Sequence, residues 1–175
     1  VEPILELLAR LERAEYIHRN ASIRAQFDHY LFEWTKRRYK NYPVLYLAFH
    51  GDESRIELGA GSITLNELGN TLAGRCEGRA IHFASCLTME ASDSDLMRFI
   101  RRTGARAVTG YQTEVEWLDS AAFEVVMLDQ LLDGHRTDAF FRGLHREHGQ
   151  MATRLGLVAA TGTRVYRPKP RTEGV

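Results

Sequence analysis

Two short apolar runs constrain the fold of this chain more than any other feature. They cover residues 44–49 and 80–85, and each is long enough for one strand. Continuous apolar runs of this length are typical of strands buried on both faces of a parallel sheet. Each run stops directly before a reactive side chain, the first before His50 and the second before Cys86.

Helical patterns separate and flank these runs. Apolar residues at helical spacing predict helices over residues 4–11, 23–34, 66–72, 94–103, 123–133 and 137–155. The predicted N-caps are Asn66 for the third helix and Ser92 or Ser94 for the fourth, which Gly104 ends. Further strands are predicted over residues 55–58 and 62–65 as a hairpin, over 105–109, and over 157–160 and 163–166 as a closing pair.

This order predicts an α/β fold with a mostly parallel central sheet and helices on both of its faces. We expect residues 1–40 to form a helical segment packed on the domain, residues 41–167 to form the core, and residues 168–175 to form a flexible tail. Ligands of such sheets bind beyond the carboxyl ends of the strands. Because His50, Cys86 and Gly110 each follow a predicted strand, we expect all three on one rim.

The composition excludes several classes of protein. The 175 residues carry 23 Lys and Arg against 23 Asp and Glu, so the formal net charge is zero, and nothing points to nucleic acid or an anionic membrane. No apolar run approaches the roughly 18 residues that a spanning helix needs. The only cysteines, Cys76 and Cys86, are too few for a disulfide framework, which indicates a reducing compartment such as the cytoplasm.

A histidine and a cysteine on one rim are the minimum apparatus of a cysteine hydrolase. A thiol attacks as its thiolate, and a nearby imidazole takes its proton and can later protonate a leaving amine. The attacked carbonyl oxygen becomes an oxyanion that needs backbone N–H donors. Gly51 has no side chain to obstruct its N–H, and Cys86 offers the second N–H. We therefore predict Cys86 as nucleophile, His50 as general base, and Gly51 and Cys86 as oxyanion donors.

Each residue also has a purely structural explanation. A histidine before glycine can sit in a turn, and cysteine is among the residue types most often buried in protein cores. The two together, each at the end of a strand, favour the catalytic interpretation. His82, inside the second apolar run, is predicted to be a buried, hydrogen-bonded histidine, and Cys76 a free thiol.

At these two junctions the chain resembles the caspase-like peptidases, the group that includes caspases, metacaspases, separase, gingipains and the bacterial CHAT domains. The shared pattern is a hydrophobic strand ending in His-Gly and a second ending in a small residue and Cys, here LYLAFHG and IHFASC. Cys86-Leu87-Thr88 is similar to the Cys-x-Thr of CHAT domains, the closest branch, and residues 104–134 resemble the strand, loop and helix that follow. The resemblance covers residues 43–166.

The resemblance implies a caspase-like three-layer sandwich and a peptidase that uses His50 and Cys86. Family members cut beside a specific residue, often Asp, Arg or Lys. The Gln-Ala that precedes the caspase cysteine is replaced here by Ala84-Ser85, so the resemblance supports the reaction and not the specificity. No two-chain maturation is predicted, and regulation would then come from another domain or a partner protein.

Three acidic residues are candidates for a substrate pocket. Glu114, Glu116 and Asp119 follow the third predicted strand and could pair with an Arg or Lys of a substrate. The alternative, which we favour, is that they lie in a solvated loop or at the start of a helix, where carboxylates suit the dipole. His145 and His148 have helical spacing for two metal ligands, but the sequence offers no further ligands at metal spacing, so no metal and no cofactor are expected.

The sequence therefore predicts a cysteine endopeptidase acting on a protein or peptide substrate through a Cys–His dyad. Two other functions stay open. One is a non-catalytic binding or scaffold module on the same fold, and the other is a thiol hydrolase that is not a peptidase. No nucleic-acid or membrane partner is expected.

Overall fold

The fold is a mixed α/β arrangement built on one central sheet, as the sequence predicts. A computed structural model describes residues 2–132 and 137–167. In this part of the chain the central sheet has five strands, in the order β1-β5-β6-β7-β8. They are β1 (Val44–Leu47), β5 (Ala80–Phe83), β6 (Ala107–Tyr111), β7 (Leu157–Thr161) and β8 (Val165–Tyr166). β1, β5 and β6 run parallel, whereas β7 and β8 are antiparallel to their neighbours.

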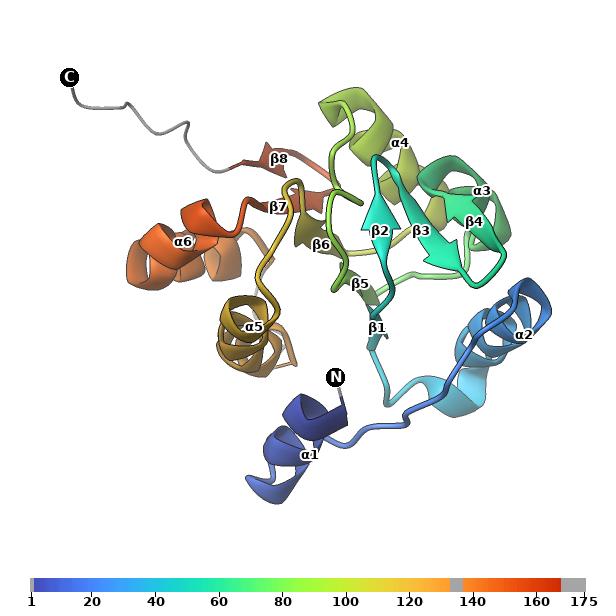
Figure 1. The fold of residues 1–175 in the computed structure, drawn as a ribbon, viewed down its shortest axis with the longest axis horizontal. Coiled ribbons are helices and arrows are strands. Elements are labelled where there is room, and N and C mark those ends of the chain that lie inside the picture. The colour runs from blue at the N-terminus through green and yellow to red at the C-terminus, as the bar shows by residue number, and fades with distance from the viewer. Residues whose placement is uncertain (1, 133–136, 168–175) are drawn as a thin grey trace.

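A second, smaller sheet is appended where β1 ends. It contains β2 (Gly51–Asp52), β3 (Arg55–Leu58) and β4 (Gly61–Thr64), all antiparallel. The hairpin predicted from residues 55–58 and 62–65 is confirmed as β3 and β4, while β2 was not foreseen. Figure 1 shows this small sheet in front of the central strands, at the rim where β1 and β5 end.

Helices cover both faces of the central sheet (Figure 1). One face carries α1 (Glu2–Arg10), α5 (Trp117–Leu132) and α6 (Thr137–Arg154), and the other carries α2 (Arg24–Trp34), α3 (Leu65–Thr71) and α4 (Asp93–Thr103); a short 3₁₀ helix, Arg37–Tyr39, follows α2. The sheet therefore separates two hydrophobic cores. Strand alternation supplies both, since Ile81 and Phe83 face the α2–α4 side, whereas Ala80, next to Ile81, faces the α5–α6 side.

Local sequence explains where most helices begin and end. Ser92 caps α4 by accepting a hydrogen bond from the Asp95 N–H at 3.1 Å, and Gly104 ends that helix in the left-handed conformation, both as predicted. The predicted cap of α3 was wrong by two residues. Thr64, not Asn66, is the N-cap, because Thr64 and Glu67 exchange hydrogen bonds in a capping box.

Two strand predictions also need correction. Gly110 lies inside β6 rather than after it, so the third predicted rim residue belongs to the sheet. A side chain there would meet Met89 and Phe83 at 2.8–2.9 Å, which explains why glycine fits this strand position. The run at residues 44–49 does pack against both cores, but it is less buried than predicted, because β1 is an edge strand and three of its four residues are only half-buried.

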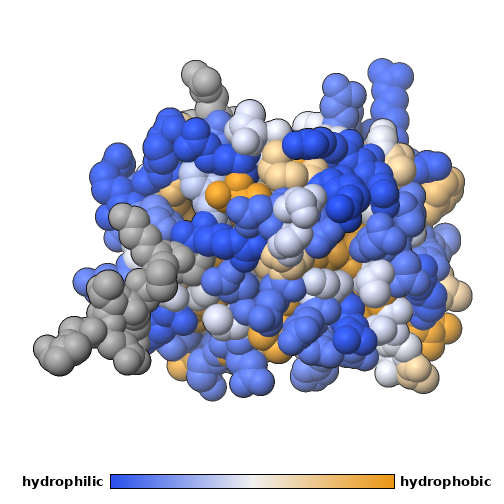
Figure 2. All heavy atoms as spheres, turned by 90° about the horizontal axis from the view of Figure 1, so that it is seen from above, coloured by the Kyte–Doolittle hydropathy of each residue, from blue (hydrophilic) through white to orange (hydrophobic). Residues whose placement is uncertain are grey.

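Other predictions fall on residues outside the described part. These are the end of the helix at residues 133–134 and the tail at residues 168–175. No described helix combines the length and apolarity needed to cross a membrane. Figure 2, which views the molecule from above, shows a mostly hydrophilic face with small hydrophobic patches.

Candidate active site

The ends of β1 and β5 bring His50 and Cys86 to neighbouring positions on one rim. Leu47 pairs with Phe83 in the parallel register, and the Ala84 N–H donates to the Leu47 carbonyl at 2.9 Å just beyond the strands. Three further residues along each chain lead to His50 and to Cys86. Because neighbouring strands lie about 4.8 Å apart, equal lengths past a paired position keep the two residues together.

Gly51 shows how close the two segments stay. A Cβ atom built on Gly51 would lie 2.2 Å from the Cys86 carbonyl oxygen and 2.5 Å from Thr88 Oγ1. Both distances are shorter than any real Cβ contact, so only glycine allows the segment after His50 to pack against the segment that carries the cysteine. This close approach is the central geometric fact of the site.

The loop that carries Cys86 is held by its neighbours on both sides. The Thr88 hydroxyl donates to the Arg55 carbonyl at 3.1 Å, and the Met89 N–H donates to the Tyr111 carbonyl at 3.0 Å. Leu87 has a φ of 58°, a left-handed conformation that leucine rarely adopts. Such backbone persists only where surrounding contacts impose it, and it turns the chain sharply directly after the cysteine.

The two cysteines differ strongly in environment. Cys86 is half-buried, and its Sγ accepts a hydrogen bond from the Val115 N–H at 3.5 Å. Cys76 is fully buried, and that burial raises the pKa of its thiol to about 11, against the smaller opposing effect of Arg79. Cys76 is therefore a buried free thiol, as predicted, and Cys86 is the accessible one.

The two backbone N–H groups predicted to bind an oxyanion are those of Cys86 and Gly51. The Cys86 N–H has no acceptor among the described residues. The Glu57 N–H donates to the His50 carbonyl at 2.8 Å, which makes the next pair, Gly51 and Ile56, a non-hydrogen-bonded pair of the β2–β3 ladder. The Gly51 N–H consequently faces away from β3.

His50 is exposed, and its imidazole makes no hydrogen bond to the Cys86 thiol in the described structure. The register that pairs Gly51 with Ile56 places Glu57 directly opposite His50. One step along, Asp52 and Arg55 are opposite each other and form an ion pair at 3.4 Å. Cross-strand partners share one face of a ribbon, so Glu57 is the acidic side chain nearest to His50 by register.

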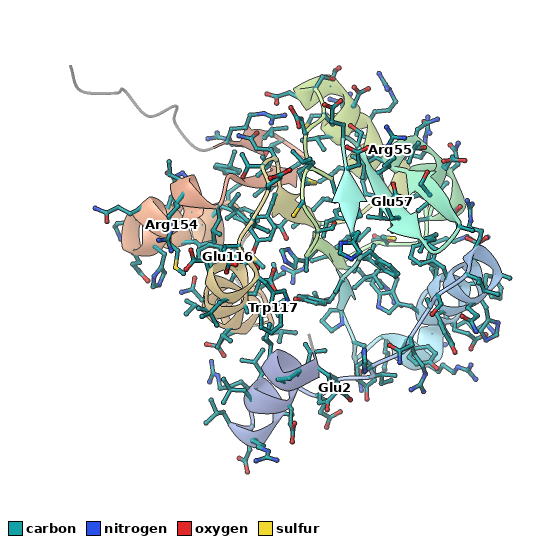
Figure 3. All side chains as sticks on the ribbon, in the orientation of Figure 1. Glu2, Arg55, Glu57, Glu116, Trp117 and Arg154 are labelled. Carbon is teal, nitrogen blue, oxygen red and sulfur yellow. The ribbon has the colours of Figure 1, made fainter. Side chains whose placement is uncertain are left out.

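The three acidic candidates are not gathered into one pocket. Glu116 accepts a hydrogen bond from the Leu118 N–H at 3.1 Å at the start of α5, and Asp119 pairs with Arg154 of α6 at 3.0 Å. Glu114 is exposed and adjoins Val115, whose N–H reaches the Cys86 sulfur. Figure 3 shows Glu116 on one side of the central strand ends, with Arg55 and Glu57 on the other.

Glu57 and Val115 were missed in the sequence. The hairpin register would have indicated Glu57, because counting back from the turn between β2 and β3 pairs it with His50. No pattern in the sequence indicates that the Val115 N–H meets the thiol, since that contact depends on how the loop after β6 folds back.

Below the rim lies a buried polar network around Glu124 of α5. Its carboxylate accepts hydrogen bonds from Tyr111 at 2.9 Å, from Tyr46 and from His82 Nε2 at 3.3 Å, while His82 Nδ1 contacts Thr109 Oγ1 at 2.8 Å. The predicted buried, hydrogen-bonded His82 is confirmed. Burial raises the pKa of Glu124, but the His82 contact and the two tyrosine hydroxyls outweigh it, and the net pKa is lowered.

In the described part of the chain, no group of three or more His, Cys, Asp or Glu side chains is placed so that it could hold a metal ion. His145 and His148 both lie on α6, which is kinked at His148.

Comparison with protein families gives a match over most of the chain. A family model described as "Family of unknown function (DUF6642)" matches residues 1–158. No curated protein matches the chain.

Proposed function

The chain belongs to the DUF6642 family, whose function is unknown, and we propose that it is a caspase-like cysteine endopeptidase domain. The observation that supports this proposal is the close approach of Gly51 to the Cys86 carbonyl, because it brings the segment that carries His50 next to the segment that carries Cys86. Parallel strands with helices on both faces agree with the caspase-like resemblance of LYLAFHG and IHFASC.

The proposed reaction needs only groups present at this rim. His50 takes the thiol proton, and the Cys86 thiolate attacks the carbonyl carbon of the scissile peptide bond. The carbonyl oxygen becomes an oxyanion held by the N–H groups of Gly51 and Cys86. His50 returns its proton to the leaving amine as the C–N bond breaks, leaving an acyl-enzyme. Water, deprotonated by His50, then releases the carboxylic acid and restores the thiol.

One observation favours a non-catalytic module instead. The His50 imidazole and the Cys86 thiol are not hydrogen bonded, and the thiol accepts from Val115. Catalytic hydrogen bonds are often long in free enzymes and tighten when substrate is bound, so this geometry does not exclude catalysis. The same residues would also serve a thiol hydrolase that is not a peptidase. The substrates that the protein hydrolyses distinguish a peptidase from such an enzyme.

Thiol reactivity tests the dyad, with Cys76 as the internal control. A peptide probe with an electrophilic ketone should label Cys86 at least about a hundredfold faster than Cys76, because only Cys86 is accessible and beside an imidazole. The variant His50→Ala should remove most of the advantage of Cys86, while Cys86→Ser should abolish rapid labelling. Equal labelling of both cysteines would contradict the enzyme assignment.

A peptide library read by cleavage position tests the substrate class. Cleavage beside one residue type would identify a peptidase, whereas ester turnover without peptide cleavage would identify a different thiol hydrolase. Glu114 is the remaining candidate for a pocket charge, so cleavage after Arg or Lys should weaken by about tenfold or more in Glu114→Gln. Cleavage after Asp would eliminate Glu114 from the pocket.

A further inference from the structure

The outer edge of β1 presents backbone groups that have no partner. The Ala80 N–H donates to the Pro43 carbonyl at 2.8 Å and the Ala84 N–H donates to the Leu47 carbonyl at 2.9 Å, so odd-numbered residues of this segment bond to β5. In a parallel ladder the alternate residues face the other way. The N–H and C=O groups of Val44, Tyr46 and Ala48 therefore point outward, where no described residue pairs with them.

A second row of backbone, outside any helix or strand, lies across from this edge. None of the backbone groups of residues 14–19, which connect α1 to α2, bonds to another backbone group of the described chain, although the His18 carbonyl accepts a hydrogen bond from the Arg19 guanidinium at 2.8 Å. Their exposure alternates strictly, with Ala14, Tyr16 and His18 half-buried and the residues between them exposed. Alternation with a period of two is the pattern of an extended strand with one face on a core.

A cavity of 1210 Å³ separates these two rows. Both rows line it, together with residues of both hydrophobic cores and polar side chains such as His29 and Glu33. Phe27, Leu31 and Trp34 of α2 face it from one core, and Leu8 and Leu128 face it from the other. We call this cavity, bounded by β1 and residues 14–19, the edge slot.

Exposed apolar side chains gather around the same part of the chain. Of the seven large hydrophobic residues exposed in the described structure, five belong to the first 34 residues: Leu7, Leu11, Ile17, Ile23 and Phe32. Of these five, only Ile17 lines the edge slot, so the other four lie on surfaces outside it.

We propose that the edge slot takes one extended strand of a separate partner polypeptide. Such a strand would hydrogen bond to Val44, Tyr46 and Ala48 on one side and to residues 14–19 on the other. Its side chains would be apolar on both faces, because each face meets one of the two cores.

Other occupants fit less well. A small molecule cannot satisfy two facing rows of alternating donors and acceptors, whereas one strand does so with its backbone alone. A second copy of this chain would have to bring its own β1 edge into the slot, but that edge is recessed between α1 and α2. Two ion pairs of the slot lining, His18 with Glu2 and Arg38 with Glu33, are formed within the protein, so these four side chains need no charged group from the partner strand.

Amide hydrogen exchange on the free protein is the first test. The Val44, Tyr46 and Ala48 amides should exchange at least about a hundredfold faster than those of Leu45 and Leu47, because only the latter pair bond to β5. Strong protection of the three outward amides in the free chain would overturn the assignment, since the chain would then fill its own edge.

Peptide binding is the second test. A displayed library of ten-residue peptides should yield binders with a continuous apolar run of four to six residues, the usual length of a strand. The best binder should slow exchange at Val44, Tyr46 and Ala48 about tenfold or more, and N-methylation of its alternate amides should weaken binding at least tenfold. Binders without an apolar run, an empty selection, or undiminished binding after N-methylation would each contradict the proposal.

A matched pair of variants locates the binding edge. Ala48→Pro removes an outward N–H without removing a β5 bond, so it should weaken binding of the selected peptide about tenfold. Ala48→Val keeps the N–H and should bind much more tightly than the proline variant. Equal affinities in the two folded variants would overturn the pairing, and if Ala48→Pro does not fold, the N-methylated peptides decide.

Discussion

At the scale of single residues, the site depends on one position where a side chain is not tolerated. Gly51 lies so close to the Cys86 carbonyl that any Cβ must push the two segments apart. That displacement would move His50 and the Gly51 N–H away from the thiol together. The proposed base and the proposed oxyanion donor are thus sensitive to the same single substitution.

The substitution Gly51→Ala should therefore lower both activity and stability. Overpacking of this kind costs about 1–3 kcal/mol in the free energy of unfolding, and a displacement of the order of 1 Å can slow a reaction about a hundredfold. Urea unfolding and the labelling rate of Cys86 measure the two effects.

Gly61→Ala is the matched control, because a Cβ there meets no atom within 4 Å. It should change stability by less than about 0.5 kcal/mol. Normal labelling of Cys86 in Gly51→Ala would contradict the importance of the close approach.

At this scale the sequence correctly predicted the buried, hydrogen-bonded His82 and the free thiol of Cys76. His50 and Cys86 stand out because each ends an apolar run, and Cys76 because it has no strand before it. The sequence did not predict contacts between residues that are far apart in the chain. One such contact is the hydrogen bond from the Val115 N–H to the Cys86 thiol, which joins residues 29 positions apart.

At the scale of elements, the Glu124 network ties β1, β5 and β6 to α5 beneath the rim. Tyr46, His82 and Tyr111 each come from a different strand, and all three contact one carboxylate that is 3% exposed. Removing the carboxylate leaves several buried polar groups without a partner. We expect Glu124→Ala to cost about 3–5 kcal/mol in the free energy of unfolding.

Stability should also depend on pH through Glu124. Its pKa in the folded state is below the ordinary value of 4.5, so the folded state binds its proton less readily than the unfolded state. The resulting stabilisation is fully present above pH 4.5 and is lost as the pH falls through the folded value. In Glu124→Gln this contribution is absent, so the difference in stability from the natural chain should shrink with acid.

The exposed ion pair between Asp119 and Arg154 supplies the comparison. Asp119→Asn should cost no more than about 1 kcal/mol, since exposed pairs contribute little. If the difference in the free energy of unfolding between Glu124→Gln and the natural chain is the same at every pH between 3 and 7, the network does not hold an ionised carboxylate.

Element types were predicted correctly more often than element ends. Residues 66–72 were correctly predicted to be helical, but the cap was misplaced because Thr64 belongs both to β4 and to the capping box. β2 escaped notice because Gly51 and Asp52 alone carry no strand pattern and pair only once β3 is in place.

At the scale of the whole molecule, one sheet separates two cores that depend on each other. Leu96 belongs to the core beside α4 and Leu144 to the core beside α6, and both are almost completely buried. Because the same strands supply both cores, loss of either should unfold the whole domain. Leu96→Ala and Leu144→Ala should each cost about 2–5 kcal/mol.

Both variants should still unfold in a single transition when tryptophan fluorescence and far-ultraviolet circular dichroism are compared. Leu118→Ala, at a residue 69% exposed, should change stability by less than about 0.5 kcal/mol. Separate transitions in either core variant would show that the two layers are independent units.

The layered α/β arrangement was predictable because strand and helix patterns alternate along the chain. The open edge of β1 was not predictable. A continuous apolar run such as residues 44–49 predicts a strand with two covered faces, but it does not indicate whether the strand has a neighbour on each side.

β1 has a consequence of its own, because its outer edge lines the slot while its carboxyl end leads within three residues to His50. A strand that binds there would restrain the segment that carries the imidazole. The coupling would then be reciprocal. If the bound strand favours acylation of Cys86, acylation of Cys86 raises the affinity for the strand by the same factor. The affinity of the edge slot for a partner strand would therefore depend on whether Cys86 is acylated.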